Sequence, residues 1–115
     1  ISRLAKCIKF TEEKINEYGL QAPIIGHVGD GNFHCTILYD PNKKEDHKII
    51  REFSDQLIQK TLELDGTITG EHGIGINKKE YLIKQHKDSI SIMQIIKKNI
   101  DPKNIMNPGK IFDID

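Results

Sequence analysis

The sequence predicts an α+β fold in which an antiparallel β-hairpin at 23–39 packs with helices. Residues 2–18 and 43–64 repeat apolar side chains at helical spacing, which is typical of amphipathic helices. Between them, two short apolar runs flank Asp30-Gly31, and Asp-Gly in that setting favours a two-residue hairpin turn. Two strands alone make a marginal sheet. We therefore expect strands from elsewhere in the protein, or a second copy of the chain as a homodimer, to complete it.

Each element of the first half has a local reason. In the first helix Leu4, Ile8 and Ile15 share one side, and Gly19 follows as a stop residue. The strands are expected at 23–28 and 33–39, where β-branched and aromatic residues are frequent. The apolar side of the helix after the hairpin consists of Ile49, Ile50, Phe53, Leu57, Ile58 and Leu64.

The second half begins with a loop at 65–76. Its four glycines allow close backbone approach and unusual dihedral angles; they are Gly66, Gly70, Gly73 and Gly75. Asn77 is predicted to cap a short helix that runs through Leu82, and Asp88 or Ser89 to cap one that runs through Ile100.

The last helix is expected to turn Ile92, Met93 and Ile96 inward and to end before Pro102. Beyond it, Asn107-Pro108-Gly109 predicts a turn within an irregular tail at 104–110.

Length and composition exclude several classes of protein. The 115 residues fit one domain, and 17 basic against 17 acidic residues give no reason to expect a nucleic-acid partner. Cys7 and Cys35 are too few and too far apart for a disulfide framework, which favours a reducing, cytoplasmic setting. No apolar run approaches the roughly 20 residues of a transmembrane helix. The chain has no starting Met, and we expect it to begin within a helix, as a fragment would.

The hairpin carries two histidines. With the turn centred on Asp30-Gly31, His27 faces His34 across the ladder, and directly opposed Cβ atoms lie about 4.5–5.5 Å apart. Two imidazoles so placed can converge on one metal ion. Alternation puts Thr36 on the same face and Cys35 on the other. The alternative is an ordinary hairpin whose histidines are satisfied by hydrogen bonds.

A third ligand is available in the glycine loop. Glu71 lies between glycines and beside His72, a setting that core packing explains poorly. Two histidines and one carboxylate make a three-ligand site with a position left open for substrate, as in catalytic zinc sites. The alternatives for Glu71 are a helix N-cap or a solvated loop carboxylate. His47 and His86 lie among charged residues on predicted helical surface, where solvation explains them.

Three blocks of sequence together carry a family resemblance. They are Gly26-His27-x-Gly29-Asp30-Gly31-Asn32-x-His34, then Gly70-Glu71-His72-Gly73-Ile74-Gly75, then Asp101-Pro102-x-Asn104-x-x-Asn107-Pro108-Gly109-Lys110. In order and spacing they resemble the C-terminal domain of FAD-linked oxidases, which include D-lactate dehydrogenases, glycolate oxidase FAD subunits and D-2-hydroxyglutarate dehydrogenases. The blocks cover about the last 90 residues.

The resemblance implies a flavoprotein of the vanillyl-alcohol oxidase type. Residues 1–115 would be the C-terminal part of its ferredoxin-like cap domain, and the FAD-binding domain would be absent from this chain. The full-length protein would be cytoplasmic, mitochondrial or peripherally attached to a membrane. By itself the chain would be catalytically inactive.

The resemblance also implies roles for individual residues. His27, His34 and Glu71 match the ligands of a divalent metal, zinc or manganese, and His72 matches the active-site base that also contacts the hydroxyacid. Thr36 stands where some members have a substrate-contacting Asn, so the resemblance implies a substrate-binding position there. In the C-terminal block, Asn107 and Lys110 match the stretch that returns to the flavin.

Two other classes of function use the same ligands. One is a stand-alone metal-binding module that lacks redox chemistry. The other is a metallohydrolase in which His72 serves as the base for a metal-bound water.

Overall fold

The computed structural model describes residues 1–114, which divide between Gly70 and Glu71 into two compact units. The first unit contains helix α1 (Leu4–Tyr18), strand β1 (Ile24–His27), the 3-10 turn η1 (Val28–Asp30), strand β2 (Asn32–Cys35) and helix α2 (Lys44–Glu63). The second contains helices α3 (Lys79–His86) and α4 (Ile90–Ile100) and an irregular tail. The predicted α+β class is confirmed. In the described part of the chain, no helix is long and apolar enough to cross a bilayer.

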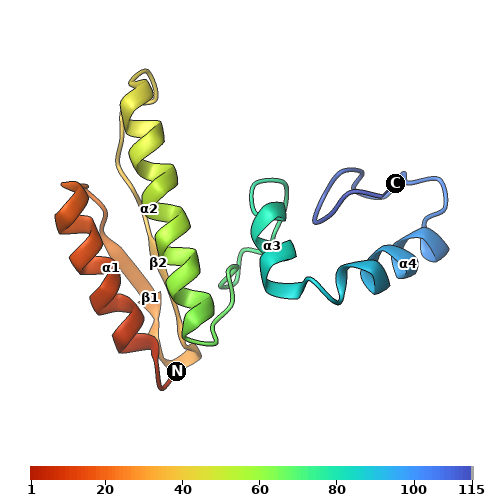
Figure 1. Ribbon diagram of the computed structural model, residues 1–115, viewed down its shortest axis with the longest axis horizontal. Helices are drawn as coiled ribbons and strands as arrows, with labels where there is room; N and C mark the ends of the chain where they lie inside the picture. The colour runs from red at the N-terminus through yellow and green to blue at the C-terminus, as the bar shows by residue number, and fades with distance from the viewer. Residues whose placement is uncertain (115) are drawn as a thin grey trace. The chain divides into compact units, whose positions relative to one another are not determined.

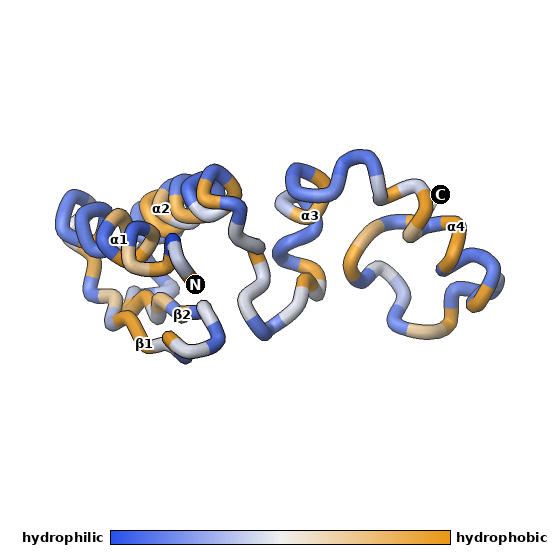
Figure 2. The backbone as a smooth tube through the Cα atoms, turned by 90° about the horizontal axis from the view of Figure 1, so that it is seen from below, coloured by the Kyte–Doolittle hydropathy of each residue, from blue (hydrophilic) through white to orange (hydrophobic). Residues whose placement is uncertain are grey.

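In the first unit the two helices form one layer and the hairpin the other. Helices α1 and α2 lie side by side over one face of the hairpin, as the two views in Figures 1 and 2 show. Both helices begin and end within two residues of the predicted bounds. Gly19 caps α1 in the left-handed conformation, as expected of a glycine stop.

The core of this unit lies between the helices. Phe53 of α2 is only 1% exposed, and its ring meets the edge of Tyr18 with centroids 6.3 Å apart. The Tyr18 hydroxyl accepts a hydrogen bond from Gln56 Nε2 at 2.7 Å, so its polar end is satisfied beside the core. The remaining buried residues of this unit are Cys7, Thr11 and Ile68.

We expect Phe53→Ala to lower the free energy of unfolding by about 3–5 kcal/mol, because it removes a fully buried ring and leaves a cavity. Urea denaturation followed by circular dichroism measures the change. Phe10→Ala removes a half-buried ring from α1 and is the matched control, with a smaller expected loss. Equal losses in both variants would show that Phe53 is not central to the core.

The strands are shorter than predicted, and the hairpin register differs from the predicted one. Ile25 pairs with His34 and His27 pairs with Asn32, whereas His27 was expected opposite His34. The reason is the turn: η1 and the left-handed Gly31 form a longer connection than a two-residue Asp-Gly turn. The regular ladder stops at Cys35 because Pro23 has no N–H to donate, although Thr36 still donates to the Pro23 carbonyl.

The second unit departs more from the prediction. Helix α3 begins at Lys79 rather than after Asn77, and Lys78 precedes it without a side-chain cap, so the Asn77 cap is wrong. Ser89 precedes α4 as predicted but makes no capping hydrogen bond through its side chain. The helix ends at Ile100, in agreement with Pro102.

The inward face expected for α4 is also wrong in part. Ile92 and Ile96 are 59% and 54% exposed, and only Met93 is half-buried. Periodicity identifies the apolar side of a helix but not the surface that covers it. The main buried residues of this unit are Leu82 in α3 and Asp101 at the end of α4.

Asp101 gives the second unit a pH dependence. Its buried carboxylate accepts hydrogen bonds from Lys97 and from the backbone N–H groups of Met106 and Ile105, and these lower its pKa below the ordinary value of 3.8. A lowered folded-state pKa means stability that is present above the ordinary pKa and lost as pH falls through the folded one.

We therefore expect Asp101→Asn to lower stability near neutral pH and to flatten its loss below about pH 4. Thermal unfolding across that pH range measures both effects. Asp88→Asn, at an exposed position between α3 and α4, is the control and should keep the wild-type profile. A wild-type profile in Asp101→Asn would contradict the assignment.

Candidate metal centre

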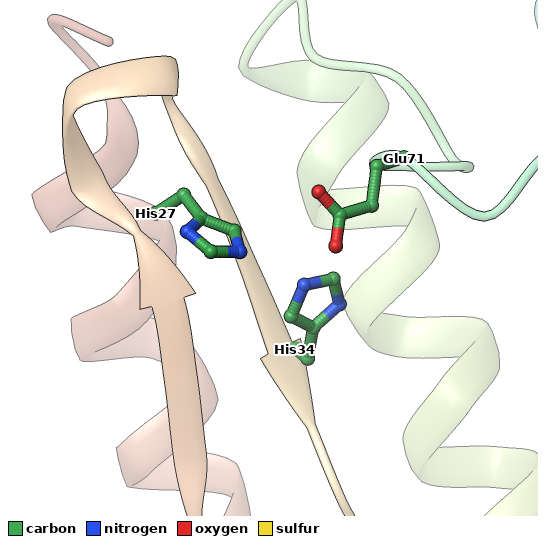
Figure 3. Close-up of side chains that lie close together, drawn as sticks. All are labelled: His27, His34 and Glu71. Carbon is green, nitrogen blue, oxygen red and sulfur yellow. The ribbon is translucent and has the colours of Figure 1, made fainter.

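The hairpin brings two histidine rings together on one face. The rings of His27 and His34 have centroids 6.2 Å apart and planes at 83°, and Figure 3 shows them on the same side of the two strands. Although the register is shifted by two residues from the predicted one, an even shift keeps every side chain on its face. The histidines are therefore diagonal rather than direct neighbours, within reach for ring-sized side chains.

The histidine face of the hairpin points away from helices α1 and α2. Helices α1 and α2 lie behind it in Figure 3, and Ile25, which shares the face, is 66% exposed. On the opposite face Phe33 packs across Gly26, where a Cβ atom would come within 2.8 Å of it. His27 also donates its backbone N–H to the Asn32 side chain at 3.4 Å, a long hydrogen bond beside the turn.

Glu71 completes a group of three. It follows Gly70, the last residue of the first unit, and one ligand atom each of His27, His34 and Glu71 lies within 4.8 Å of the others. In Figure 3 the Glu71 carboxylate points toward the two rings. His34 is half-buried and the other two are exposed. The structure thus places together the three residues that the sequence selected as ligands.

His72 lies next to the group but is not part of it. Its Nε2 is 3.9 Å from the Glu71 carboxylate, and its side chain is 67% exposed. The glycine loop around it takes left-handed angles at Gly70, Gly73 and Gly75, with φ of +52°, +74° and +55°. The predicted need for unusual backbone angles is confirmed there.

The other candidate residues, Thr36, Asn107 and Lys110, are not part of the group of three. Thr36 is exposed just beyond β2 and keeps the parity of the histidine face. Asn107 has φ of +50° and accepts a backbone hydrogen bond from Lys110, so the predicted turn is present. The side chains of Asn107 and Lys110 are both exposed in the second unit. Their predicted role toward a flavin stays a prediction.

Cys35 is no competing ligand. It lies on the other face of the hairpin from the histidines, and burial raises the pKa of its thiol. The neutral thiol is a poor metal ligand. Both cysteines are free, in line with the prediction.

Sequence reasoning missed the side chains that fix the tail. No pattern in the sequence singled out Lys79 or Lys97, yet their ammonium groups bind Asp113 and Asp101, respectively, and backbone carbonyls. The i, i+4 spacing of Lys97 and Asp101 could have indicated one of these pairs. Nothing local in the sequence indicates the contact between Lys79 and Asp113.

The chain matches a known protein family over nearly its whole length. Residues 1–111 match the family model described as "FAD linked oxidases, C-terminal domain". The chain belongs to this family. The resemblance read from the three sequence blocks is therefore confirmed.

Named relatives of this FAD-linked oxidase domain match nearly the whole chain. "Probable D-lactate dehydrogenase, mitochondrial" from Danio rerio is 42% identical over 99% of the chain and 23% of its own length. "D-lactate dehydrogenase [cytochrome], mitochondrial" from Kluyveromyces lactis is 40% identical over 100% of the chain and 20% of its length. "Glycolate oxidase subunit GlcD" from Bacillus subtilis is 38% identical over 99% of the chain and 24% of its length. The chain thus spans about a fifth to a quarter of these relatives.

Proposed function

We propose that this domain supplies the metal and substrate site of an FAD-dependent 2-hydroxyacid dehydrogenase or oxidase. One observation carries the proposal: His27, His34 and Glu71 gather their ligand atoms within 4.8 Å in an FAD-linked oxidase domain. The relatives named as D-lactate dehydrogenases and a glycolate oxidase subunit support a small 2-hydroxyacid as substrate. A mitochondrial location belongs to the same proposal, because two of these relatives carry it in their names.

The domain organisation is part of the proposal. Because the chain spans about a fifth of its relatives, the FAD-binding domain is expected in the remainder of the full-length protein. The two-stranded hairpin would then be one part of a larger antiparallel sheet in a ferredoxin-like cap domain. By itself the 115-residue chain is expected to be inactive, since the flavin carries the redox step.

The three side chains fit a divalent ion. Two imidazole nitrogens and one carboxylate oxygen suit zinc and manganese, and three protein ligands leave a coordination position for substrate. His27 and Glu71 are both exposed, so a small ligand can reach them. A bound ion would act as a Lewis acid and template for the hydroxyl and carboxylate of a 2-hydroxyacid.

The remaining residues take the roles that the substrate requires. His72 follows Glu71 directly, and its exposed imidazole can accept the proton of a hydroxyl held beside the three ligands. Thr36 keeps the parity of the ligand face, where its hydroxyl can hydrogen-bond a substrate oxygen. We assign Asn107 and Lys110 to the surface that meets the flavin. When bound, the flavin would accept the hydride from C2 of the substrate.

Anaerobic reduction of the full-length protein tests this function. D-lactate, glycolate and D-2-hydroxyglutarate are added in turn, and loss of the oxidised flavin absorption is recorded. We expect at least one of them to reduce the flavin, and the 115-residue chain alone to turn over none. An unreduced flavin with all three acids, together with metal-dependent ester hydrolysis, would favour the metallohydrolase instead.

A further inference from the structure

The start of the tail is fixed by one buried carboxylate. Asp101 follows the last residue of α4, is 5% exposed, and accepts hydrogen bonds from the backbone N–H groups of Ile105 and Met106 at 3.0 and 2.9 Å. Lys97 pairs with the same carboxylate and donates to the Met106 carbonyl at 2.5 Å. The reversal of the chain after α4 is therefore set by these two side chains.

The end of the tail is fixed by both helices of the second unit. Lys79, the first residue of α3, donates from Nζ to the Gly109 carbonyl at 3.3 Å and to Asp113 Oδ1 at 2.5 Å. Its side chain is only 18% exposed, which is unusual for a lysine. Gln94 of α4 donates from Nε2 to the Asp113 carbonyl at 2.7 Å. Helices α3 and α4 thus hold the same short segment.

Between these ends the tail contacts the glycine loop. The Ile111 N–H donates to the Gly75 carbonyl at 2.8 Å, and Ile111 has φ of +69°, a left-handed angle that β-branched residues rarely adopt. Backbone strain of this kind persists only where the surroundings fix it, and it gathers at functional sites. Gly75 lies three residues after His72 in the same loop.

We propose that residues 101–113 form a strap that positions the loop carrying Glu71 and His72. Lys79 and Ile111 are its positioning residues, the first by fixing the end of the strap and the second by contacting the loop. What the positioned loop does rests on the proposed function. The strap itself rests on contacts within the second unit, so it is testable whether or not the protein oxidises a hydroxyacid.

Amide hydrogen exchange of the full-length protein tests the strap at two points. Lys79→Met removes both contacts of the ammonium group and keeps the apolar stem. Ile111→Pro removes the donor to Gly75 and also excludes the observed φ of +69°, because proline fixes φ at about −65°. In each variant we expect exchange at 70–76 to become about tenfold faster or more. Lys79→Arg and the control Lys103→Met, at an exposed tail position, should exchange as wild type. Unchanged exchange at 70–76, with faster exchange in the tail, would overturn the proposal.

Steady-state kinetics give a second readout. If the full-length protein turns over a 2-hydroxyacid, Lys79→Met should lower kcat about 10- to 100-fold with KM within about twofold, since a displaced base slows chemistry more than binding. Lys79→Arg should restore most of kcat. A drop in thermal stability without a change in kcat would overturn the positioning role. If the proposed function is wrong, neither the wild type nor the variants will turn over a 2-hydroxyacid, but exchange at 70–76 will still be faster in Lys79→Met.

Discussion

Replacing His34 by alanine is expected to weaken zinc or manganese binding at least about 100-fold, since even groups that only orient ligands contribute 10- to 100-fold. His34 is the most enclosed of the three candidate ligands, and its ring lies 6.2 Å from that of His27. Competition against a chelator of known affinity, in the full-length protein, measures the loss. Activity should fall in parallel unless excess metal is supplied.

The control for this variant is His47→Ala. His47 lies on α2, where its ring bonds the Pro41 carbonyl at 2.9 Å and has no part in the group of three. The substitution His47→Ala removes an imidazole from the same unit and should leave metal affinity unchanged. A similar loss in both variants, or none in His34→Ala, would contradict the ligand assignment.

Replacing His72 by glutamine is expected to lower kcat by about 10²–10⁴-fold, the usual contribution of general acid–base catalysis. The variant keeps a polar side chain of similar reach but cannot accept a proton. Metal content should be retained, because His72 lies beside Glu71 and outside the group of three. Stopped-flow measurement of flavin reduction by the best substrate separates the chemical step from product release.

His86→Gln, in the last turn of α3, is the matched control and should keep the wild-type rate. Two outcomes would contradict the role of His72 as a general base. One is a raised KM with unchanged kcat, which would make it a binding residue. The other is loss of the metal, which would make it a ligand.

The closeness of His27, His34 and Glu71 could be predicted from the sequence although the register of the hairpin could not. The Asp30-Gly31 dipeptide indicated a two-residue turn, and the structure instead has a 3-10 turn closed by Gly31. The resulting shift moved the partner of His27 from His34 to Asn32. Since side chains alternate with period two, an even shift preserved the shared face, and a shift by one residue would have separated the histidines.

The helices differ in how much of them the sequence determines. For α1 and α2, apolar periodicity and the Gly19 stop suffice, because each helix packs its apolar side within its own unit. In α4 the same kind of pattern predicted an inward Ile92 that is 59% exposed. The local sequence indicates which side of a helix is apolar, but only the tertiary structure shows what packs on that side.

The tail was the least predictable part of the second unit. Its turn at Asn107-Pro108-Gly109 follows from local residue preferences, and Gly109 does take a left-handed φ of +70°. The contacts of Lys79 join residues 30 and 34 positions apart in the chain, and no local pattern encodes such a pair. Side chains that position a loop through contacts distant in sequence can be identified only from the three-dimensional structure.

Elemental analysis of the purified protein tests the metal centre most directly. Wild type is compared with His27→Ala and Glu71→Ala, and with His47→Ala as the control that keeps all three ligands. We predict about one zinc or manganese ion per chain in the wild type and in His47→Ala, and almost none in the other two variants, as expected for a site of three protein ligands. Equal metal content in all four proteins would contradict the proposal that His27, His34 and Glu71 bind a metal ion.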